Sequence, residues 1–405
     1  MKWRLGGLLA AITIAGCQEK LTAPADCPAL CPGGQPEVFD EIFTPVSGAD
    51  SSYVGYVLPH QAPAMLVSNG LQASEDRGLV RFLTRASTVT VRDTARTYTI
   101  DSVALSFTIL ARDTNQTGLQ LLVYRLSPSF DSSATFTAVD PAFVPGNLIA
   151  TIPVPDTLNS GGVRAVFDAA DLPRVEIPPS DSGRLAVGLR IGGPPATGVR
   201  IGALAGGSGP VFTTYATLDV PDTGTAKLRT IALGAGLTTY VEESSPVADS
   251  ALLEVGGSPS ARAMLRFNLP SRIRDSATIV RATLELTPVA PITGLPTDPA
   301  RLLSRAVLAD VGAKSPVNPT VGRSGLFPPP ADTLEIGNTT VSLEVVRLVE
   351  LWLGRTTRPS ALMLSLTPEA ASFTRPVFYS TRAADPALRP RLRISYLLSF
   401  PFETP

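Results

Sequence analysis

The stretch that decides the fold is RAMLRFNLP at residues 262–270, followed by ATIVRATLELTP at residues 277–288. Apolar side chains stand at every second position from 280 to 286, with polar ones between them. A period of two with one apolar face is typical of a half-buried β-strand. Similar runs at 105–109 and 391–396 are separated by clusters of Pro, Gly, Asp and Ser. Short strands between frequent turns predict an all-β chain, built as sandwiches or jelly rolls.

Composition excludes several classes of protein. Hydrophobic residues make up 44% of the 405 residues and charged ones 17%, which is too apolar for a disordered chain. Lys plus Arg is 34 and Asp plus Glu is 35, so no basic field is available for nucleic acid. There is one histidine, and neither a zinc-protease, phosphate-loop nor serine-elbow motif occurs. We therefore expect no enzymatic activity.

The two halves of the chain resemble each other. RGLVRFLT near Arg81 matches RAMLRFNLP near Arg266, an offset of 266 − 81 = 185 residues. PVFTTY at Pro210 matches PVFYST at Pro376, and AKLRTIAL from Ala226 matches PRLRISYL further on, with somewhat smaller offsets. Motifs kept in order with a drifting offset indicate a duplicated module with loops of unequal length. The prediction is two tandem sandwiches, at residues 39–236 and 237–400.

One segment of the second module breaks the strand pattern. Within residues 341–354, Val345, Leu348, Val349 and Trp352 recur at the spacing of one helical face. The segment predicts one short α-helix in this module. Because Trp352 lies on the apolar face, we expect it to pack in the core.

The N-terminus predicts a lipid anchor. Lys2 and Arg4 precede an apolar stretch of about eleven residues, which is too short to span a bilayer. The stretch ends in Ile-Ala-Gly-Cys17, which is similar to the lipobox of bacterial lipoproteins. The sequence therefore predicts a signal peptide at 1–16 and a lipidated Cys17. Since Gln18 rather than Asp follows, sorting to the outer membrane is expected, facing either the periplasm or the cell surface.

The segment between the anchor and the first module has its own features. Residues 17–38 are rich in Pro and Ala and predict a flexible tether. Cys27 and Cys31 within it are expected to form a disulfide in an oxidising compartment, with free thiols as the alternative. Four-coordinate zinc has no support, because no further cysteine or histidine lies nearby.

The second module resembles the DNRLRE family, jelly-roll modules of bacterial secreted and surface proteins. The resemblance is carried by RAMLRFNLP with ATIVRATLELTP, VVRLVELWLG, SALMLSLTP and VFYSTRAADPALRPRLRISY. Some members of the family are described as polysaccharide-binding modules. The resemblance therefore implies a jelly-roll fold and a carbohydrate-binding-module-like role in the cell envelope, with the first module matching more loosely.

A polysaccharide site would need exposed aromatic rings, and a guanidinium pairs well with a sugar carboxylate. The aromatic content is only 6%. Outside the apolar stripes, the candidate ligand-binding residues are Tyr53, Tyr56, Tyr215, Tyr379, Arg382 and Arg389. The alternative is that these tyrosines line strands and the arginines solvate the sheet faces.

Acidic residues leave two further questions open. Asp101, Asp113, Asp131 and Asp140 are scattered through loops and strand ends, where acids commonly form turns. No cofactor or metal site is predicted, although a structural calcium stays open because jelly-roll modules often carry one. A polysaccharide hydrolase or lyase would need two of the acids to converge.

Three hypotheses follow for the function. The first is a lipid-anchored, non-enzymatic envelope protein that binds polysaccharide through its jelly-roll modules. The second is a structural or assembly lipoprotein that binds another envelope protein, which the same anchor and repeats would serve. The third, less favoured, is a hydrolase or lyase.

Overall fold

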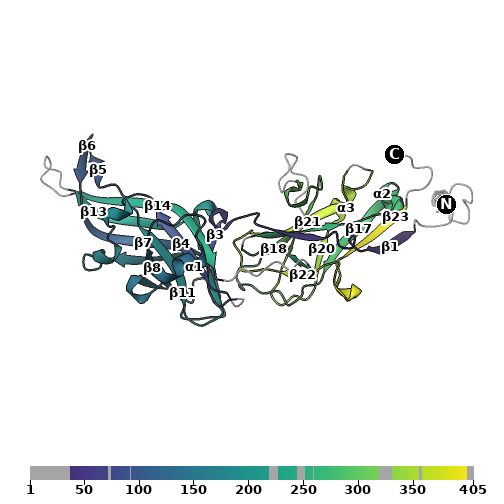
Figure 1. The fold of residues 1–405 in the computed structure, drawn as a ribbon, viewed down its shortest axis with the longest axis horizontal. Coiled ribbons are helices and arrows are strands. Elements are labelled where there is room, and N and C mark those ends of the chain that lie inside the picture. The colour runs from purple at the N-terminus through teal and green to yellow at the C-terminus, as the bar shows by residue number, and fades with distance from the viewer. Residues whose placement is uncertain are drawn as a thin grey trace, which may run out of the picture.

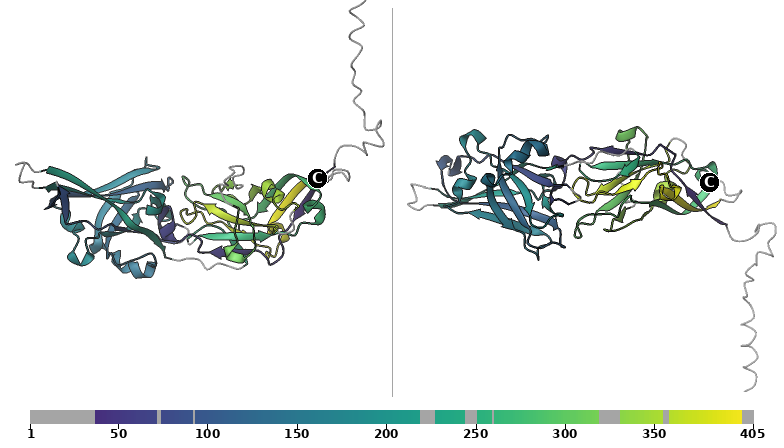
Figure 2. Two further views of the ribbon diagram at one scale, coloured as in Figure 1. Left: turned by 90° about the horizontal axis from the view of Figure 1, so that it is seen from above. Right: turned by 60° about the horizontal axis from the view of Figure 1, so that its bottom comes forward.

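The structure is a computed structural model that describes residues 37–71, 74–91, 93–218, 227–243, 251–258, 260–318, 331–354 and 358–398. It confirms the predicted all-β class, with antiparallel strands, few short helices and two β-sandwiches of jelly-roll type. Figures 1 and 2 show the two sandwiches end to end, one mostly blue and teal and the other mostly green and yellow.

The first sandwich has two layers joined by one long strand. One layer holds β3, β12, β7 and β13, with β10 also paired to β7, and the other holds β4, β11, β8 and β9. Strand β14 pairs with β13 through its first half and with β4 through its second half. The bounds are β3 Ala64–Asn69, β4 Asp76–Phe82, β5 Thr88–Val91, β6 Thr94–Thr97, β7 Thr99–Arg112, β8 Gln120–Leu126, α1 Phe136–Val139, β9 Leu148–Pro153, β10 Gly161–Phe167, β11 Ala186–Gly192, β12 Thr197–Gly202, β13 Val211–Leu218 and β14 Lys227–Glu242.

The second sandwich repeats this plan with two facing sheets and a short extra pair. The sheets run in the orders β1-β23-β17-β20 and β19-β18-β21-β16-β2, and β15 pairs with β22. The bounds are β1 Val38–Phe43, β2 Ser51–Val54, β15 Leu252–Glu254, β16 Ala261–Arg266, α2 Ser271–Arg274, β17 Ala277–Leu286, β18 Arg301–Ala306, β19 Ala331–Thr333, β20 Val341–Glu344, α3 Val346–Glu350, β21 Ala361–Thr367, β22 Val377–Tyr379 and β23 Arg391–Leu398.

The strand pairing differs from the predicted division at 236/237. β1 and β2, expected in the first module, pair with β23 and β16 of the second sandwich. In Figure 1 the purple β1 lies beside the yellow β23. β14 continues past the predicted boundary to Glu242 and completes the first sandwich. Hydrogen-bonding partners that are far apart in sequence therefore decide to which sandwich a strand belongs. The order of the segments along the chain does not decide it.

The internal repeat is visible in the order of strands. The order β4-β11-β8-β9 of the first sandwich recurs as β16-β21-β18-β19 in the second. RGLVRFLT on β4 and RAMLRFNLP on β16 therefore hold equivalent places. The later motif matches do not hold equivalent places. β13 pairs with β7 as β23 pairs with β17, so β13 and β23 are the equivalent strands. PVFTTY lies on β13 but its match PVFYST lies on β22, and AKLRTIAL lies on β14 but its match PRLRISYL lies on β23.

The predicted helix at residues 341–354 is only partly present. Residues 341–344 form β20, because Val341 and Leu343 are buried against β17 while the residues between them are exposed. The helix α3 spans Val346–Glu350, and the second sandwich also contains α2, which the sequence did not predict. Trp352 is buried, with its ring centroid 6.0 Å from that of Phe267, which confirms the predicted core packing.

The two sandwiches share an apolar joint. Leu295, Ala371 and Phe373, from loops of the second half, belong to the same buried cluster as the core of the first sandwich. The hydroxyl of Tyr240 on β14 donates to the carbonyl of Ala370 at 2.6 Å. The bodies are therefore packed against each other.

The predicted anchor falls outside this part of the chain. Cys17, Cys27 and Cys31 lie outside the described residues. Within the described residues, no helix is long and apolar enough to cross a membrane.

Candidate functional site

The repeated motif R-x-x-x-R on β4 places Arg77 and Arg81 on the outer face of the first sandwich. The Arg77 guanidinium lies 4.3 Å from the ring centroid of Phe136 and 4.4 Å from that of Phe143. It also forms an ion pair with Asp140 at 2.6 Å. Cation–π contacts and a charge-assisted hydrogen bond together fix α1 over the sheet.

The second arginine of the motif holds the segment that precedes α1. Arg81 Nη1 donates to the carbonyl oxygens of Pro128 at 3.2 Å and Phe130 at 2.7 Å. The segment reads SPSFDSSATF from residue 127 to 136. Its carbonyls turn toward the arginine, and it crosses the face of the sheet as an irregular loop.

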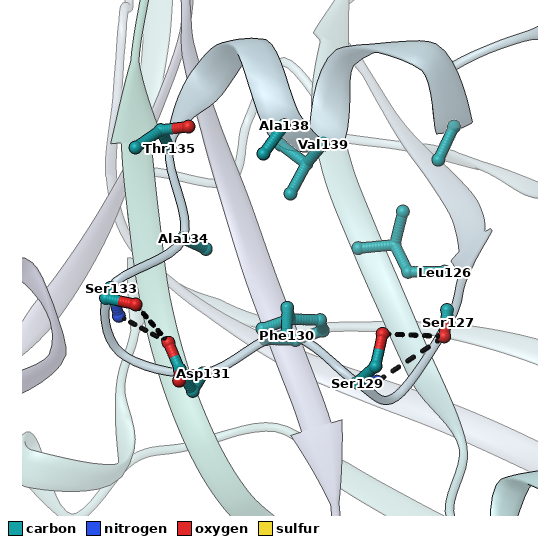
Figure 3. A pocket seen from close by; sticks show the side chains of 11 residues that line it. Leu126, Ser127, Ser129, Phe130, Asp131, Ser133, Ala134, Thr135, Ala138 and Val139 are labelled. Atoms are coloured by element: carbon teal, nitrogen blue, oxygen red, sulfur yellow. Dashed lines mark hydrogen bonds between the residues drawn. The ribbon is translucent and has the colours of Figure 1, made fainter.

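This loop and α1 line an open pocket of about 390 Å³, which we call the serine pocket (Figure 3). The volume falls within the range of about 300–1,000 Å³ that is typical of small-molecule sites. Its lining residues are Leu126, Ser127, Ser129, Phe130, Asp131, Ser133, Ala134, Thr135, Ala138, Val139 and Ala142.

The rim of the serine pocket is organised by hydrogen bonds. The hydroxyls of Ser127 and Ser129 lie 2.9 Å apart. Oδ1 of Asp131 accepts from the backbone N–H of Ser133 at 2.8 Å and from its hydroxyl at 2.6 Å. These hydrogen bonds hold the pKa of Asp131 below its ordinary value, with a smaller contribution from the charge of Arg81. The rim therefore presents a carboxylate among hydroxyls.

The floor of the pocket is apolar, and β11 lies close beneath it. Leu126 and Val139 belong to a buried cluster with Phe143, and Phe130 and Ala134 pack against that cluster. Gly188 of β11 allows this approach, since a Cβ at that position would overlap the Phe143 ring. An apolar floor under a hydroxylated rim suits a ligand that has a hydrocarbon face and hydroxyl groups at its edge.

Two of the predicted binding tyrosines are engaged by arginines of the same sandwich. The hydroxyl of Tyr215 on β13 accepts from Nη2 of Arg164 at 2.8 Å, and the guanidinium lies 5.6 Å from the ring centroid. The ring of Tyr56 lies 4.1 Å from the guanidinium carbon of Arg262, and its hydroxyl donates to the carbonyl of Ala313.

The remaining candidates lie elsewhere. Tyr53 on β2 stands opposite Arg262 in the ladder, and Tyr379 on β22 stands opposite Leu252. Arg382 donates to the carbonyl of Gly48 at 3.0 Å, and Arg389 donates to that of Ala383 at 2.9 Å. Tyr53 and Tyr56 therefore lie together, beside Arg262 and against the same buried cluster, whereas the other four lie elsewhere, so the six do not converge on one site.

The serine pocket was not predicted from the sequence, in which Asp131 stood only among the scattered acids. The signal available was the serine-rich run at 127–136 between two strands. That composition is equally typical of a solvated turn. The cation–π contacts of Arg77 with Phe136 and Phe143, and the hydrogen bonds that Arg81 donates to the loop, show that the run is folded back over an apolar floor.

The other acids named from the sequence have local roles. Asp101 accepts from the Thr217 hydroxyl at 2.6 Å, and Asp113 accepts from the backbone N–H of Asn115 at 3.0 Å, a turn contact of the expected kind. Among the residues that the structure describes, no group of three or more His, Cys, Asp or Glu side chains could hold a metal ion.

A second concavity, of about 350 Å³, lies on the sheet β1-β23-β17-β20. Its charges pair within the sheet: Asp40 with Arg393 at 2.5 Å, and Arg281 with Glu344 at 3.1 Å. Asp40, Arg281, Thr283, Glu285, Ser342, Arg393 and Ser395 line it, so it offers no aromatic or apolar floor. The serine pocket is the better candidate site.

Comparison with known proteins leaves the family open. No protein-family model matches the chain, and a search of curated proteins finds no relative. The chain is 14% identical to a solved chain described with manganese lipoxygenase of Gaeumannomyces graminis and zonadhesin of Komagataella pastoris, with 84% of each chain covered and a TM-score of 0.12. It is 8% identical to the CBM22-1–CBM22-2 tandem domain of Paenibacillus barcinonensis Xyn10C, over 90% of this chain and 99% of that one, with a TM-score of 0.13. At these scores neither likeness carries an argument about the ligand.

Proposed function

We propose that the protein is a lipid-anchored, non-enzymatic envelope protein of the outer membrane that binds a saccharide in the serine pocket. The single observation that supports this is the combination of an apolar floor with a rim of hydroxyls and one carboxylate. The lipobox at Cys17 supports the anchor, and the DNRLRE-like motifs support a surface role.

The pocket offers directional contacts to a sugar. Oδ1 of Asp131 takes both bonds from Ser133, and within the described residues Oδ2 has no hydrogen-bond partner. An ionised carboxylate accepts only, so Oδ2 would take sugar hydroxyls as donors. The hydroxyls of Ser127 and Ser129 would add weaker contacts, and Phe130 and Ala134 would lie against the sugar C–H face.

A binding role is favoured over hydrolysis by the acids present. The serine pocket is lined by one carboxyl group, that of Asp131. Glycoside hydrolysis in its usual form uses two carboxyl groups about 5–9.5 Å apart on either side of the bond.

The test is isothermal titration of the soluble full chain with a panel of neutral and acidic oligosaccharides. Replacing Asp131 by Ala should weaken binding at least tenfold, since hydrogen bonds to a charged group contribute about 1.5–3 kcal/mol. Asp168→Ala is the matched control, because Asp168 also caps a turn, accepting from Ala170 N at 3.0 Å, but does not line the pocket. Equal loss in both variants, or saccharide binding that Asp131→Ala leaves unchanged, would refute the site.

The alternative is a structural or assembly lipoprotein that binds another envelope protein. It is favoured by the engagement of Tyr56 and Tyr215 with arginines of their own sandwiches, which removes them as a sugar platform. Stoichiometric co-purification of one envelope protein, together with no saccharide binding by the folded chain, would establish this alternative instead.

A further inference from the structure

Each sandwich is completed by a strand from the other half of the sequence. In the first sandwich, β14 joins the two layers by pairing with β13 and then β4. In the second, β1 pairs with β23 and β2 with β16, which are the equivalents of β13 and β4. The segment β1–β2, residues 38–54, is called here the donor strand, and its place between β23 and β16 the acceptor slot.

The sequence repeat begins at these strands. Nine residues, 55–63, separate β2 from β3, and nine residues, 243–251, separate β14 from β15. SSYV at 51–54 on β2 also matches TTYV at 238–241 on β14, at an offset of 238 − 51 = 187 residues. That offset is close to the 185 of the R-x-x-x-R motif. The chain is therefore two repeats that have exchanged their leading strands.

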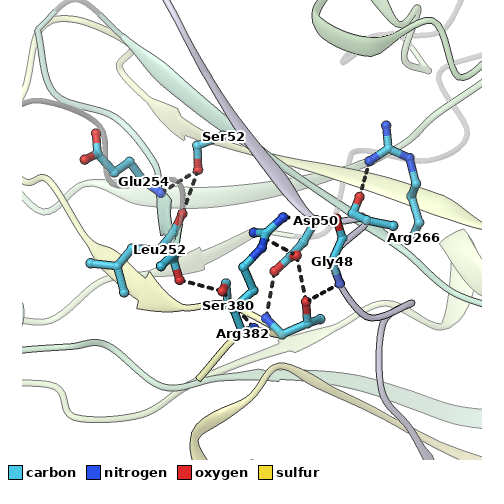
Figure 4. A network of polar contacts seen from close by, with 11 residues as sticks. Gly48, Asp50, Ser52, Leu252, Glu254, Arg266, Ser380 and Arg382 are labelled. Atoms are coloured by element: carbon cyan, nitrogen blue, oxygen red, sulfur yellow. Dashed lines mark hydrogen bonds and ion pairs between the residues drawn. The ribbon is translucent and has the colours of Figure 1, made fainter. Parts of the chain in front are cut away.

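Just before β2, the donor strand is held by a buried carboxylate (Figure 4). Asp50 is 1% exposed and accepts from the backbone N–H and the hydroxyl of Thr381, each at 2.7 Å. Arg382 Nη1 lies 3.4 Å from Asp50 Oδ1. Its Nη2 donates to the carbonyl of Gly48, whose N–H donates to the Thr381 hydroxyl at 3.0 Å.

The two ends of the donor strand are also complementary to the acceptor slot. Ser52 accepts from the N–H of Glu254 at 2.8 Å, next to the β15 carbonyls. At the other end the Phe39 ring stacks on Tyr396 with centroids 5.5 Å apart, and Glu41 accepts from the Tyr396 hydroxyl at 2.7 Å. Aromatic stacking, contacts of charged groups and hydrogen bonds to the backbone thus all fit the donor strand to the acceptor slot.

We propose that the acceptor slot is an interaction surface for the donor strand of a second copy of this chain, so that two copies assemble by exchanging residues 38–54. The contacts between the donor strand and the acceptor slot are the same whichever copy supplies the strand. What exchange changes is the link at 55–63, where the N–H groups of Gly55 and Tyr56 donate to the carbonyl of Ser260 at 3.0 and 3.3 Å. Exchange of an identical element is otherwise a low-cost route to dimers.

Concentration decides between the closed and the exchanged form. A short link gives the donor strand of the same chain an effective concentration in the millimolar range. Copies folding in dilute solution therefore close on themselves. Copies that fold side by side at a comparable local concentration exchange; that chains in one membrane reach it rests on the proposed lipid anchor.

The test uses full chains whose three natural cysteines are replaced by serine, each carrying one new thiol. One chain carries Ile42→Cys on the donor strand, and the other carries Arg393→Cys, its ladder partner on β23. Opposed residues of an antiparallel pair have Cα atoms about 4.5–5.5 Å apart, within the range of a disulfide. The two chains are unfolded, mixed and refolded together either at about 1 µM, far below the effective concentration, or at about 1 mM, which reaches it, and are then oxidised.

We expect the mixed disulfide dimer to increase severalfold between the two concentrations, above a control in which Val166→Cys replaces Arg393→Cys. Val166 is 58% exposed and lies on β10 of the first sandwich, so that control measures random collision. A single chain carrying both Ile42→Cys and Arg393→Cys should close on itself at about 1 µM. If this double variant closes but the mixed dimer never exceeds the control, exchange between copies is refuted; if the double variant does not close, the acceptor slot itself is refuted. Neither result bears on the serine pocket.

Discussion

Stability should fall as the pH rises from 5 to 8, and replacing Asp76 by Asn should remove much of this fall. Asp76 on β4 stands directly opposite Glu242 on β14 in the ladder. Two like charges placed opposite each other across a sheet are destabilising. Asp76 is buried and accepts from the Ser68 hydroxyl at 2.6 Å, while Oε2 of Glu242 has no hydrogen-bond partner within the described residues. The charged groups around this pair are Glu75, Arg77, Arg190, Glu254 and Arg375.

The magnitude follows from the pKa of Asp76. Burial, and to a lesser degree the charge of Glu75, raise this pKa from 3.8 to about 6 on folding, against the opposing Ser68 hydrogen bond. The folded state then holds the proton of Asp76 more tightly than the unfolded state does. The contribution of Asp76 to stability is therefore full below about pH 4 and is lost as the pH rises through about 6. The whole loss is about 3 kcal/mol, of which about 1.4 kcal/mol falls between pH 5 and pH 8. Glu242, with a pKa raised to about 7 mainly by burial and then by Asp76, acts in the same direction.

The assay is urea denaturation of the full chain at pH 5, 6, 7 and 8, followed by far-UV circular dichroism. Asp76→Asn should raise the free energy of unfolding at pH 8 by about 1–3 kcal/mol and flatten its pH dependence. Asp332→Asn, an exposed acid on β19, is the control and should change neither. Constant stability of the natural chain from pH 5 to 8, or lower stability of Asp76→Asn at pH 8, would refute this account of the acid pair.

Three other substitutions probe the Asp50 contacts of the donor strand, the floor of the serine pocket and the joint between the two sandwiches. Asp50→Ala should destabilise the second sandwich by about 2–3 kcal/mol, measured by chemical denaturation. It leaves the buried N–H and hydroxyl of Thr381 without their charged acceptor. Gly188→Ala should displace Phe143 and cost about 1–3 kcal/mol by overpacking; unchanged stability and unchanged pocket-loop proteolysis would contradict the close approach. Arg200→Met should cost about 3 kcal/mol, because it leaves Asp298, 6% exposed, unpaired at the joint; a hydrogen-exchange experiment should show faster exchange there than in a matched surface Arg174→Met variant.

Local patterns were enough to predict the class of fold. The alternation over 280–286 became β17, and the RGLVRFLT and RAMLRFNLP motifs became equivalent strands. Period-two burial is a local property, so it can be read from neighbouring residues. The predicted start of the helix at 341 was wrong, because cross-strand pairing of Leu343 with Leu284 outweighs the helical spacing of the residues that follow.

The candidate site was not predictable in the same way. Tyr56 and Tyr215 looked exposed in the sequence, but their partners Arg262 and Arg164 are distant along the chain. The serine-rich loop lines a pocket because Arg77 and Arg81, on a strand about 50 residues earlier, hold α1 and the loop carbonyls over the sheet. Both outcomes depend on contacts between segments whose approach no single-sequence pattern specifies.

The exchange of leading strands changes how any function of this protein should be measured. A cut at 236/237, where the sequence repeat suggests a boundary, would divide β14 and strip β1–β2 from the second sandwich. The edges of β23 and β16 would then be unpaired, and open strand edges bind other chains nonspecifically. Saccharide binding lost by such fragments would report a damaged sheet and not a missing site. The serine pocket lies wholly within residues 126–142, yet the layer beneath it is completed by β14, so its ligand has to be sought with the whole chain.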